Sequence, residues 1–159
     1  MIDTQKVTGR RTLKFSSWDD IRRDAQELAA GDVTCLGNWS AGQVFSHCAQ
    51  TMHAFLDRHA FQPPPWWARI LGRVLKNRIL NGTMRPGFRI PDPVLAPLEA
   101  VTTAQGVADL EKAIHRWQTS EPPPSHPFFG SMSGEDWDKL HLRHCEMHFS
   151  FLRQKESRG

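Results

Sequence analysis

The chain has 159 residues, of which 39% are apolar and 23% charged, and its formal net charge is +3. This size and composition are typical of a globular protein, so we expect residues 1–159 to form a single domain. No run of 18 apolar residues occurs and the first residues lack an apolar signal region, so we expect neither a transmembrane segment nor a secretory leader. Three cysteines at wide spacing are typical of reduced thiols, which favours a cytoplasmic protein.

The N-terminal region is predicted to contain an extended arm and one helix. Residues 1–15 show no helical period and are expected to form the arm. Apolar residues then recur at helical spacing over residues 18–30. Ser16 or Ser17 is suited to cap this helix, and Gly31 to end it.

Two further helices are predicted before the middle of the chain. A capping box of Ser40 and Gln43 begins the second helix, which is expected to continue to about His59. Three prolines at 63–65 then prevent its extension. The third helix is predicted over residues 66–80. We expect its apolar stripe to pack into a helical bundle; the stripe comprises Trp67, Ile70, Leu71, Val74, Leu75 and Ile79.

The second half of the chain is predicted to be a long crossover followed by two helices. Residues 81–104 are rich in turn formers and are expected to form an irregular connection. A fourth helix is predicted over residues 104–119, and the last helix from Ser133 to about Lys155. No strand-like alternation of useful length occurs. The sequence therefore predicts an all-α fold, a bundle of four main helices with one extra helix.

Histidines are concentrated in the last predicted helix. His144 and His148 are four residues apart, so their side chains lie one above the other on one helix face. Two imidazoles at this spacing can reach one metal ion, although such pairs also occur in helices that bind none. A third ligand must come from another helix, and His47, on the inward side of the second helix, is the best candidate.

Other residues near this group have weaker or competing interpretations. His126 and His141 are candidates for a general acid or a fourth ligand, but His126 is also suited to fix its loop and His141 to line the core. Cys48 and Cys145 are expected to be small buried side chains. Glu146 is expected to face away from the metal ligands. Surface positions are expected for His53, His59 and His115, and orienting polar partners among Gln43, Thr51 and Asp136.

Three segments carry a resemblance to a known family. Residues 38–47, which begin with Asn-Trp-Ser and end at His47, resemble the start of the second helix in the DinB-like superfamily. Residues 144–148 resemble its paired-histidine helix. The sequence of residues 126–152, together with the Pro-Pro-Pro-Trp-Trp stretch at the start of the third helix, is similar to the DUF1569 branch of that superfamily. The resemblance implies one DinB-like domain, a four-helix bundle of DinB/YfiT-like type.

The resemblance also implies a function. It implies a divalent metal ion held by His47, His144 and His148, with zinc or nickel expected and iron or copper open. Members of the superfamily include thiol-dependent S-transferases, and a hydrolase fits an open metal site equally well. The alternative is a non-catalytic stress or binding protein whose metal is structural. The implied partners are a small anionic or thiol substrate and a second copy in a homodimer.

The stretch 58–91 is basic and contains no acidic residue. Its cations are Arg58, Arg69, Arg73, Lys76, Arg78, Arg85 and Arg89. This charge indicates a solvated helix face, a positive rim that attracts an anionic substrate, or contact with a membrane surface or nucleic acid. No helix-turn-helix or zinc-finger spacing is present, so specific recognition of nucleic acid is not expected.

Overall fold

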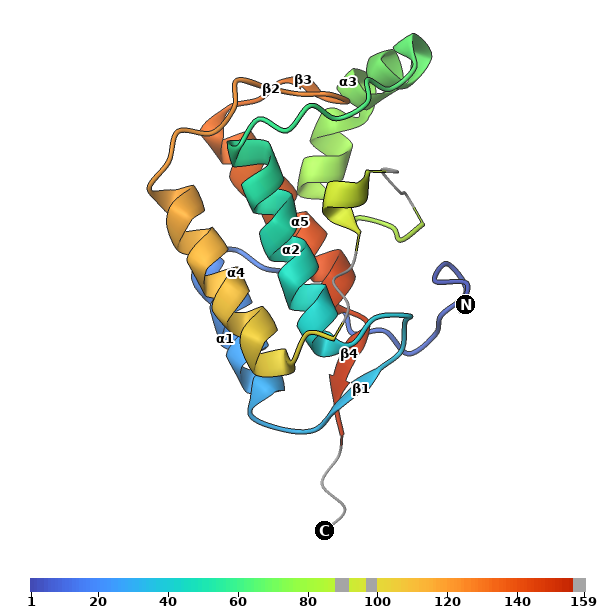
Figure 1. The fold of residues 1–159 in the computed structure, drawn as a ribbon. Coiled ribbons are helices and arrows are strands. Elements are labelled where there is room, and N and C mark those ends of the chain that lie inside the picture. Colours follow the sequence, from blue (N-terminus) through green and yellow to red (C-terminus); the bar gives the residue numbers. More distant parts are fainter. Residues whose placement is uncertain (88–91, 97–99, 156–159) are drawn as a thin grey trace.

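The computed structural model describes residues 1–87, 92–96 and 100–155 (Figure 1). Arg89 and parts of the predicted crossover lie outside these residues. The described part is mostly helical, which confirms the predicted helical fold class. Its helices are α1 (Trp18–Ala29), α2 (Ala41–Leu56), α3 (Trp66–Asn81), the short 3-10 helix η1 (Pro93–Leu95), α4 (Thr103–Gln118) and α5 (Gly134–Phe149). None of these helices has the length and apolarity that crossing a bilayer requires.

The predicted starts of three helices are confirmed by side-chain caps. At each, a serine hydroxyl accepts a backbone N–H three residues ahead, and the side chain at that position accepts the serine N–H. Such a box satisfies two donors that the first helical turn leaves without intrahelical partners. The pairs are Ser17 with Asp20 in α1, Ser40 with Gln43 in α2, and Ser133 with Asp136 in α5.

Two predicted helix ends are wrong by several residues. The helix expected to reach about His59 ends at Leu56, because Arg58 adopts a left-handed backbone conformation (φ 53°) that an α-helix cannot continue. The helix expected to reach Lys155 ends at Phe149, where the chain leaves the helix and becomes extended.

The expectation of no strands is also wrong. β4 (Leu152–Gln154) pairs antiparallel with β1 (Val33–Cys35), so the segment after α5 returns along the segment after α1. β2 (Ser125–His126) pairs with β3 (Gly130–Ser131) in a hairpin before α5. Strands of two or three residues are too short to show the alternation by which a strand is recognised in sequence.

Helices α1, α2, α4 and α5 share the core. α2 packs against α4 and α5, and α1 also contacts both of those helices (Figure 1). The core side chains are apolar, and Phe45, Ile114, Trp137 and Phe149 are among those with no exposed surface. This packing places the inward face of α2 opposite the inward face of α5.

The crossing of α2 and α4 depends on two glycines. A Cβ atom on Gly106 would lie 2.5 Å from the carbonyl oxygen of Gly42 and 2.8 Å from its Cα, and backbone atoms cannot move aside without separating the helices. We expect Gly106→Ala to lower the free energy of unfolding by about 2 kcal/mol, although alanine normally stabilises a helix interior. Urea unfolding measures the change. Gly31→Ala, where a Cβ meets nothing within 4 Å, is the control, and equal stability of both variants would contradict the prediction.

The predicted orientation of the third helix is wrong. α3 lies outside the other four helices, along α5 and β3 (Figure 1), and Ile70, Leu71 and Val74 face solvent instead of the core. Its inward side is formed by Gly72 and Leu80, which are buried. The physical reason is a close approach that only glycine allows, since a Cβ at Gly72 would lie 2.4 Å from the carbonyl oxygen of Phe128.

Candidate metal centre

Two helices bring three histidines together, as the sequence predicted. The capped start of α2 orients that helix so that His47 faces inward, where its side chain is buried. His144 and His148 project from the last two turns of α5, and both are partly exposed. One nitrogen from each of the three rings lies within 4.8 Å of the others. Residues that are 97 to 101 positions apart along the chain therefore share one point in space.

The spacing of these rings is the spacing that a shared ion requires. The ring centroid of His47 lies 5.3 Å from that of His144 and 4.6 Å from that of His148. The Nε2 atoms of His144 and His148 are 3.1 Å apart. Two nitrogens each about 2.05 Å from one ion are separated by about 2.9 Å at a right angle and about 3.3 Å at the tetrahedral angle. The 3.1 Å separation lies between these limits.

Neighbouring groups hold the rings in orientation. Nδ1 of His47 lies 3.1 Å from the carbonyl oxygen of Leu95 in η1, which accepts a hydrogen bond from it and so leaves the lone pair on Nε2. The indole ring of Trp39 stacks on His148, at 5.4 Å between centroids and an interplanar angle of 6°. The same indole lies 4.7 Å from the ring of His47. Both contacts limit rotation of the imidazoles.

The three imidazoles are neutral near pH 7. Burial lowers the pKa of His47 to about 4, against a smaller opposing effect of the hydrogen bond to Leu95. Burial, followed by the charge of the neighbouring imidazoles, lowers the pKa of His144 and of His148 well below the usual value. A neutral imidazole keeps the lone pair that a metal ligand needs. The set therefore offers three nitrogen donors without first releasing protons.

A guanidinium group lies beside this set. Arg10 donates hydrogen bonds to Oγ of Ser150 and to the carbonyl oxygen of Met147, and it lies 4.3 Å from the ring centroid of Phe151. Its charge also contributes to the lowered pKa of His148. The N-terminal arm thus places a fixed positive charge next to the three histidines.

These residues fit a divalent transition-metal ion. The donors are three neutral nitrogens of the type that zinc, nickel, iron and copper accept. Nδ1 of His144 is buried and has no hydrogen-bond partner among the described residues. That atom is the ring nitrogen other than the one facing His148, so the convergent atoms of the group are Nε2 of His144 and Nε2 of His148.

His126 and His141 lie in a separate aromatic cluster. The ring of His141 is 4.2 Å from that of Trp117 and stacks on Trp137, and its Nε2 has no partner in the described part of the chain. Nδ1 of His126 accepts backbone N–H groups of the following turn, at 3.1 Å from Phe128. The core position of His141 and the loop-fixing position of His126 are thus confirmed. A catalytic role for either stays a prediction.

The burial of His126 makes stability depend on pH. Burial lowers its pKa in the folded protein to about 4, so the unfolded chain, at about 6.5, takes up the proton first. The contribution of neutral His126 to the free energy of unfolding is therefore complete above about pH 6.5 and is lost as the pH falls toward 4. We expect wild-type protein to lose about 3 kcal/mol more than His126→Asn over that interval, since asparagine keeps an acceptor for the turn but does not titrate. Urea unfolding in chelator at several pH values measures this, and parallel curves would contradict it.

The other predicted neighbours of the site take different positions. Thr51 donates to the carbonyl oxygen of His47, within α2, and Gln43 completes the helix cap. Asp136 pairs with Lys76 at 2.6 Å and does not reach the histidines. Glu146 faces away from them, as predicted. The groups that do orient the rings are Leu95 and Trp39. Leu95 carried no distinguishing sequence signal, and Trp39 was marked only by its place next to a helix cap and within the Asn-Trp-Ser stretch of the family resemblance.

The cysteines are not part of the site. Cys48 and Cys145 are fully buried, which confirms the expectation of small core side chains. A hydrogen bond with Cys48, together with burial, raises the pKa of Cys145 well above that of a free thiol. A thiol of this kind is a poor nucleophile and a poor metal ligand at neutral pH.

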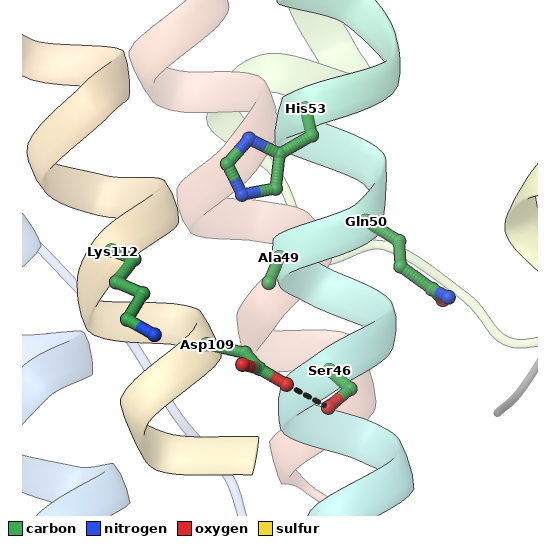
Figure 2. Close-up of a pocket in the computed structure, with 6 residues that line it drawn as sticks. All are labelled: Ser46, Ala49, Gln50, His53, Asp109 and Lys112. Atoms are coloured by element: carbon green, nitrogen blue, oxygen red, sulfur yellow. Dashed lines mark hydrogen bonds between the residues drawn. The ribbon is translucent and has the colours of Figure 1, made fainter. Parts of the chain in front are cut away.

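A depression in the surface lies between α2 and α4 (Figure 2). It encloses about 160 Å³ and is lined by Ser46, Ala49, Gln50, His53, Asp109 and Lys112. Ser46 donates to Asp109 at 3.1 Å, and His53, which is half-buried instead of exposed, lies 2.9 Å from a guanidinium nitrogen of Arg116. His59 and His115 are exposed as predicted. None of the three clustered histidines lines this depression, so it is separate from the candidate metal centre.

Comparison with known proteins gives one result. Residues 7–155 match the family described as protein of unknown function (DUF1569). No curated protein and no solved structure matches the chain. The family match spans both histidine-bearing helices, and its description assigns no activity to them.

Proposed function

This chain belongs to the DUF1569 family of proteins of unknown function, and from that premise we propose that it binds one divalent metal ion through His47, His144 and His148. The observation that carries the proposal is the convergence of three neutral imidazole nitrogens within 4.8 Å of one another. Catalytic metal sites typically take three ligands from the protein and keep one position open, whereas structural sites take four. We therefore assign this site to catalysis.

We further infer that the four core helices form a bundle of DinB-like type, with α3 as the extra helix. The contacts of α1 and α2 with both α4 and α5 support this arrangement. In such bundles, metal sites are built from side chains on facing helices. The positions of His47 on α2 and of the histidine pair on α5 agree with that rule.

We propose zinc or nickel as the ion, since the donor set has three imidazoles and neither thiolate nor carboxylate. When bound, such an ion supplies Lewis acidity toward an oxygen or sulfur atom of the substrate. The protein contributes orientation: the Leu95 carbonyl holds the tautomer of His47, and Trp39 holds the plane of His148. Shielding of the three rings from solvent lowers their pKa values and so keeps them neutral.

We propose a small substrate with an anionic or thiol group, and S-transfer or hydrolysis as the reaction. Arg10 supports the substrate class, because its guanidinium adds a positive charge beside the histidines, and such a charge attracts a carboxylate or thiolate. Its hydrogen bonds to Ser150 and Met147 hold the guanidinium in place.

The test compares stripped and reloaded protein. Chelator-treated protein is reloaded with zinc or with nickel, and both forms are assayed for thiol addition to a small electrophile, for ester hydrolysis and for melting temperature. Turnover only in a reloaded form supports the proposal. A large fall in melting temperature on stripping, without turnover in any form, would assign the ion to folding. Failure of the stripped protein to take up either ion would remove the proposal altogether.

A further inference from the structure

The outward face of α3 is apolar and uncovered. Five side chains on this face are at least half exposed: Trp66 (74%), Trp67 (57%), Ile70 (52%), Leu71 (50%) and Val74 (74%). Together they expose on the order of 600 Å², the upper end of what the largest patch on a monomeric protein shows. We call these five residues the α3 patch. A patch of this size marks a surface that binds something.

The helix cannot roll to bury this patch. Its opposite side is fixed by three contacts: Gly72 fits against the carbonyl of Phe128, Lys76 pairs with Asp136 at 2.6 Å, and Leu80 is buried. A rotation that turned the patch inward would place side chains larger than hydrogen where Gly72 now sits. The outward position of the patch is therefore built into the fold.

Positive charge surrounds the patch. Arg69 and Arg73 flank it on one side of the helix, and Arg78 lies on the other side near its end. All three are exposed, and none forms an ion pair with a described residue. The sequence from Arg58 to Pro91 contains no acidic residue, so nothing within the stretch neutralises these cations.

We propose that the α3 patch docks on an anionic lipid bilayer, with α3 lying flat in the interface. An apolar helix face flanked by arginine, with tryptophan at one end, is the chemistry that partitions into the headgroup region. A helix of 16 residues is about 24 Å long and presents its full length to the surface. Long arginine side chains reach the phosphates while the apolar face is buried.

A second copy of the chain fits this face less well. In a symmetric dimer the same patch meets itself, so Arg69, Arg73 and Arg78 of both copies would be brought together, and the stretch 58–91 supplies no acidic residue to either copy. Like charges without neutralising partners oppose that association. An anionic surface meets the same cations with attraction, which is why we assign the face to a bilayer.

The test is co-sedimentation with vesicles of phosphatidylcholine alone or with 30% phosphatidylglycerol. We expect full-length protein to sediment with the anionic vesicles at low salt and to bind them at least tenfold more weakly at 0.5 M salt. With neutral vesicles the protein should stay in the supernatant. Trp66→Ala/Trp67→Ala and Arg69→Glu/Arg73→Glu should each weaken binding at least tenfold. These side chains are exposed, so far-UV circular dichroism should remain that of the wild type.

A charge-matched variant distinguishes binding through this face from attraction of the whole protein's net charge to anionic vesicles. Arg23→Glu/Lys112→Glu changes the net charge equally, on α1 and α4, and should leave vesicle binding within twofold of wild type. Equal weakening by both charge-reversed variants would overturn the proposal, as would absence of binding to anionic vesicles. A wild-type dimer in sedimentation analysis that Trp66→Ala/Trp67→Ala converts to a monomer would also overturn it, in favour of a second copy.

Discussion

Substitution of His148 by alanine is expected to abolish stable metal binding. The wild type should hold one divalent ion per chain, and the variant should bind it at least 100-fold more weakly, because loss even of a group that merely orients a ligand costs 10 to 100-fold. The remaining nitrogens, from His47 and His144, are then the only two of the set left to hold an ion. Elemental analysis after dialysis, and competition with a chromogenic chelator, measure the change.

The matched control for this substitution is His115→Ala, which removes an exposed imidazole from α4. It should leave both the metal content and the affinity unchanged. Circular dichroism of the His148 variant should remain helical, since the rest of the core is intact. A His148→Ala protein with full metal content would remove that residue from the site.

Glu146→Ala is expected to cause the largest loss of stability. The Glu146 carboxylate pairs with Arg143 at 2.8 Å and accepts the backbone N–H of Phe15, and both charged side chains are almost fully buried. Removal of one partner leaves a buried charge without compensation, which costs about 3–5 kcal/mol. The N-terminal arm also loses an attachment, since the Phe15 N–H is left without the carboxylate that accepts it. Urea unfolding measures the loss.

Two variants make this prediction specific. Glu135→Ala, on the same helix but exposed, should change stability by less than about 1 kcal/mol. Glu146→Gln keeps an oxygen that accepts the Phe15 N–H and should lose less than Glu146→Ala. Below its melting temperature, the Glu146→Ala protein should keep its metal, because this side chain faces the arm instead of the histidines. Equal losses in the two alanine variants would refute the role of the buried pair.

The local features of the fold could be predicted because each depends on residues that are only a few positions apart in the sequence. A capping box needs only residues three positions apart, and His144 and His148 need only one helical turn to share a face. His47 was identified from its place on the inward side of its predicted helix and from the family resemblance. These signals can be recognised without knowledge of how the helices pack.

The surroundings of the site could not be predicted because they depend on distant backbone. The Leu95 carbonyl reaches His47 from a position 48 residues away, and any residue type can supply a carbonyl oxygen. Arg10 arrives from the N-terminal arm, which shows no periodicity that would fix its path. The strands after α1 and α5 are likewise visible only once the chain is folded.

The third helix shows the limit of periodicity as a guide. Its apolar stripe was correctly placed on one face, but a pattern does not say whether that face meets the core or solvent. Steric exclusion decided the question here, since Gly72 admits the Phe128 backbone and no larger residue would. The stripe predicted to lie in the core is therefore the exposed α3 patch.

X-ray absorption at the metal edge tests the central claim most directly. Wild-type protein loaded with one equivalent of zinc or nickel should show three imidazole nitrogens at about 2.0–2.1 Å, and His47→Ala should lose one of them. A spectrum with fewer than three imidazoles, or with sulfur in the first coordination sphere, would contradict the account of a centre formed by His47, His144 and His148.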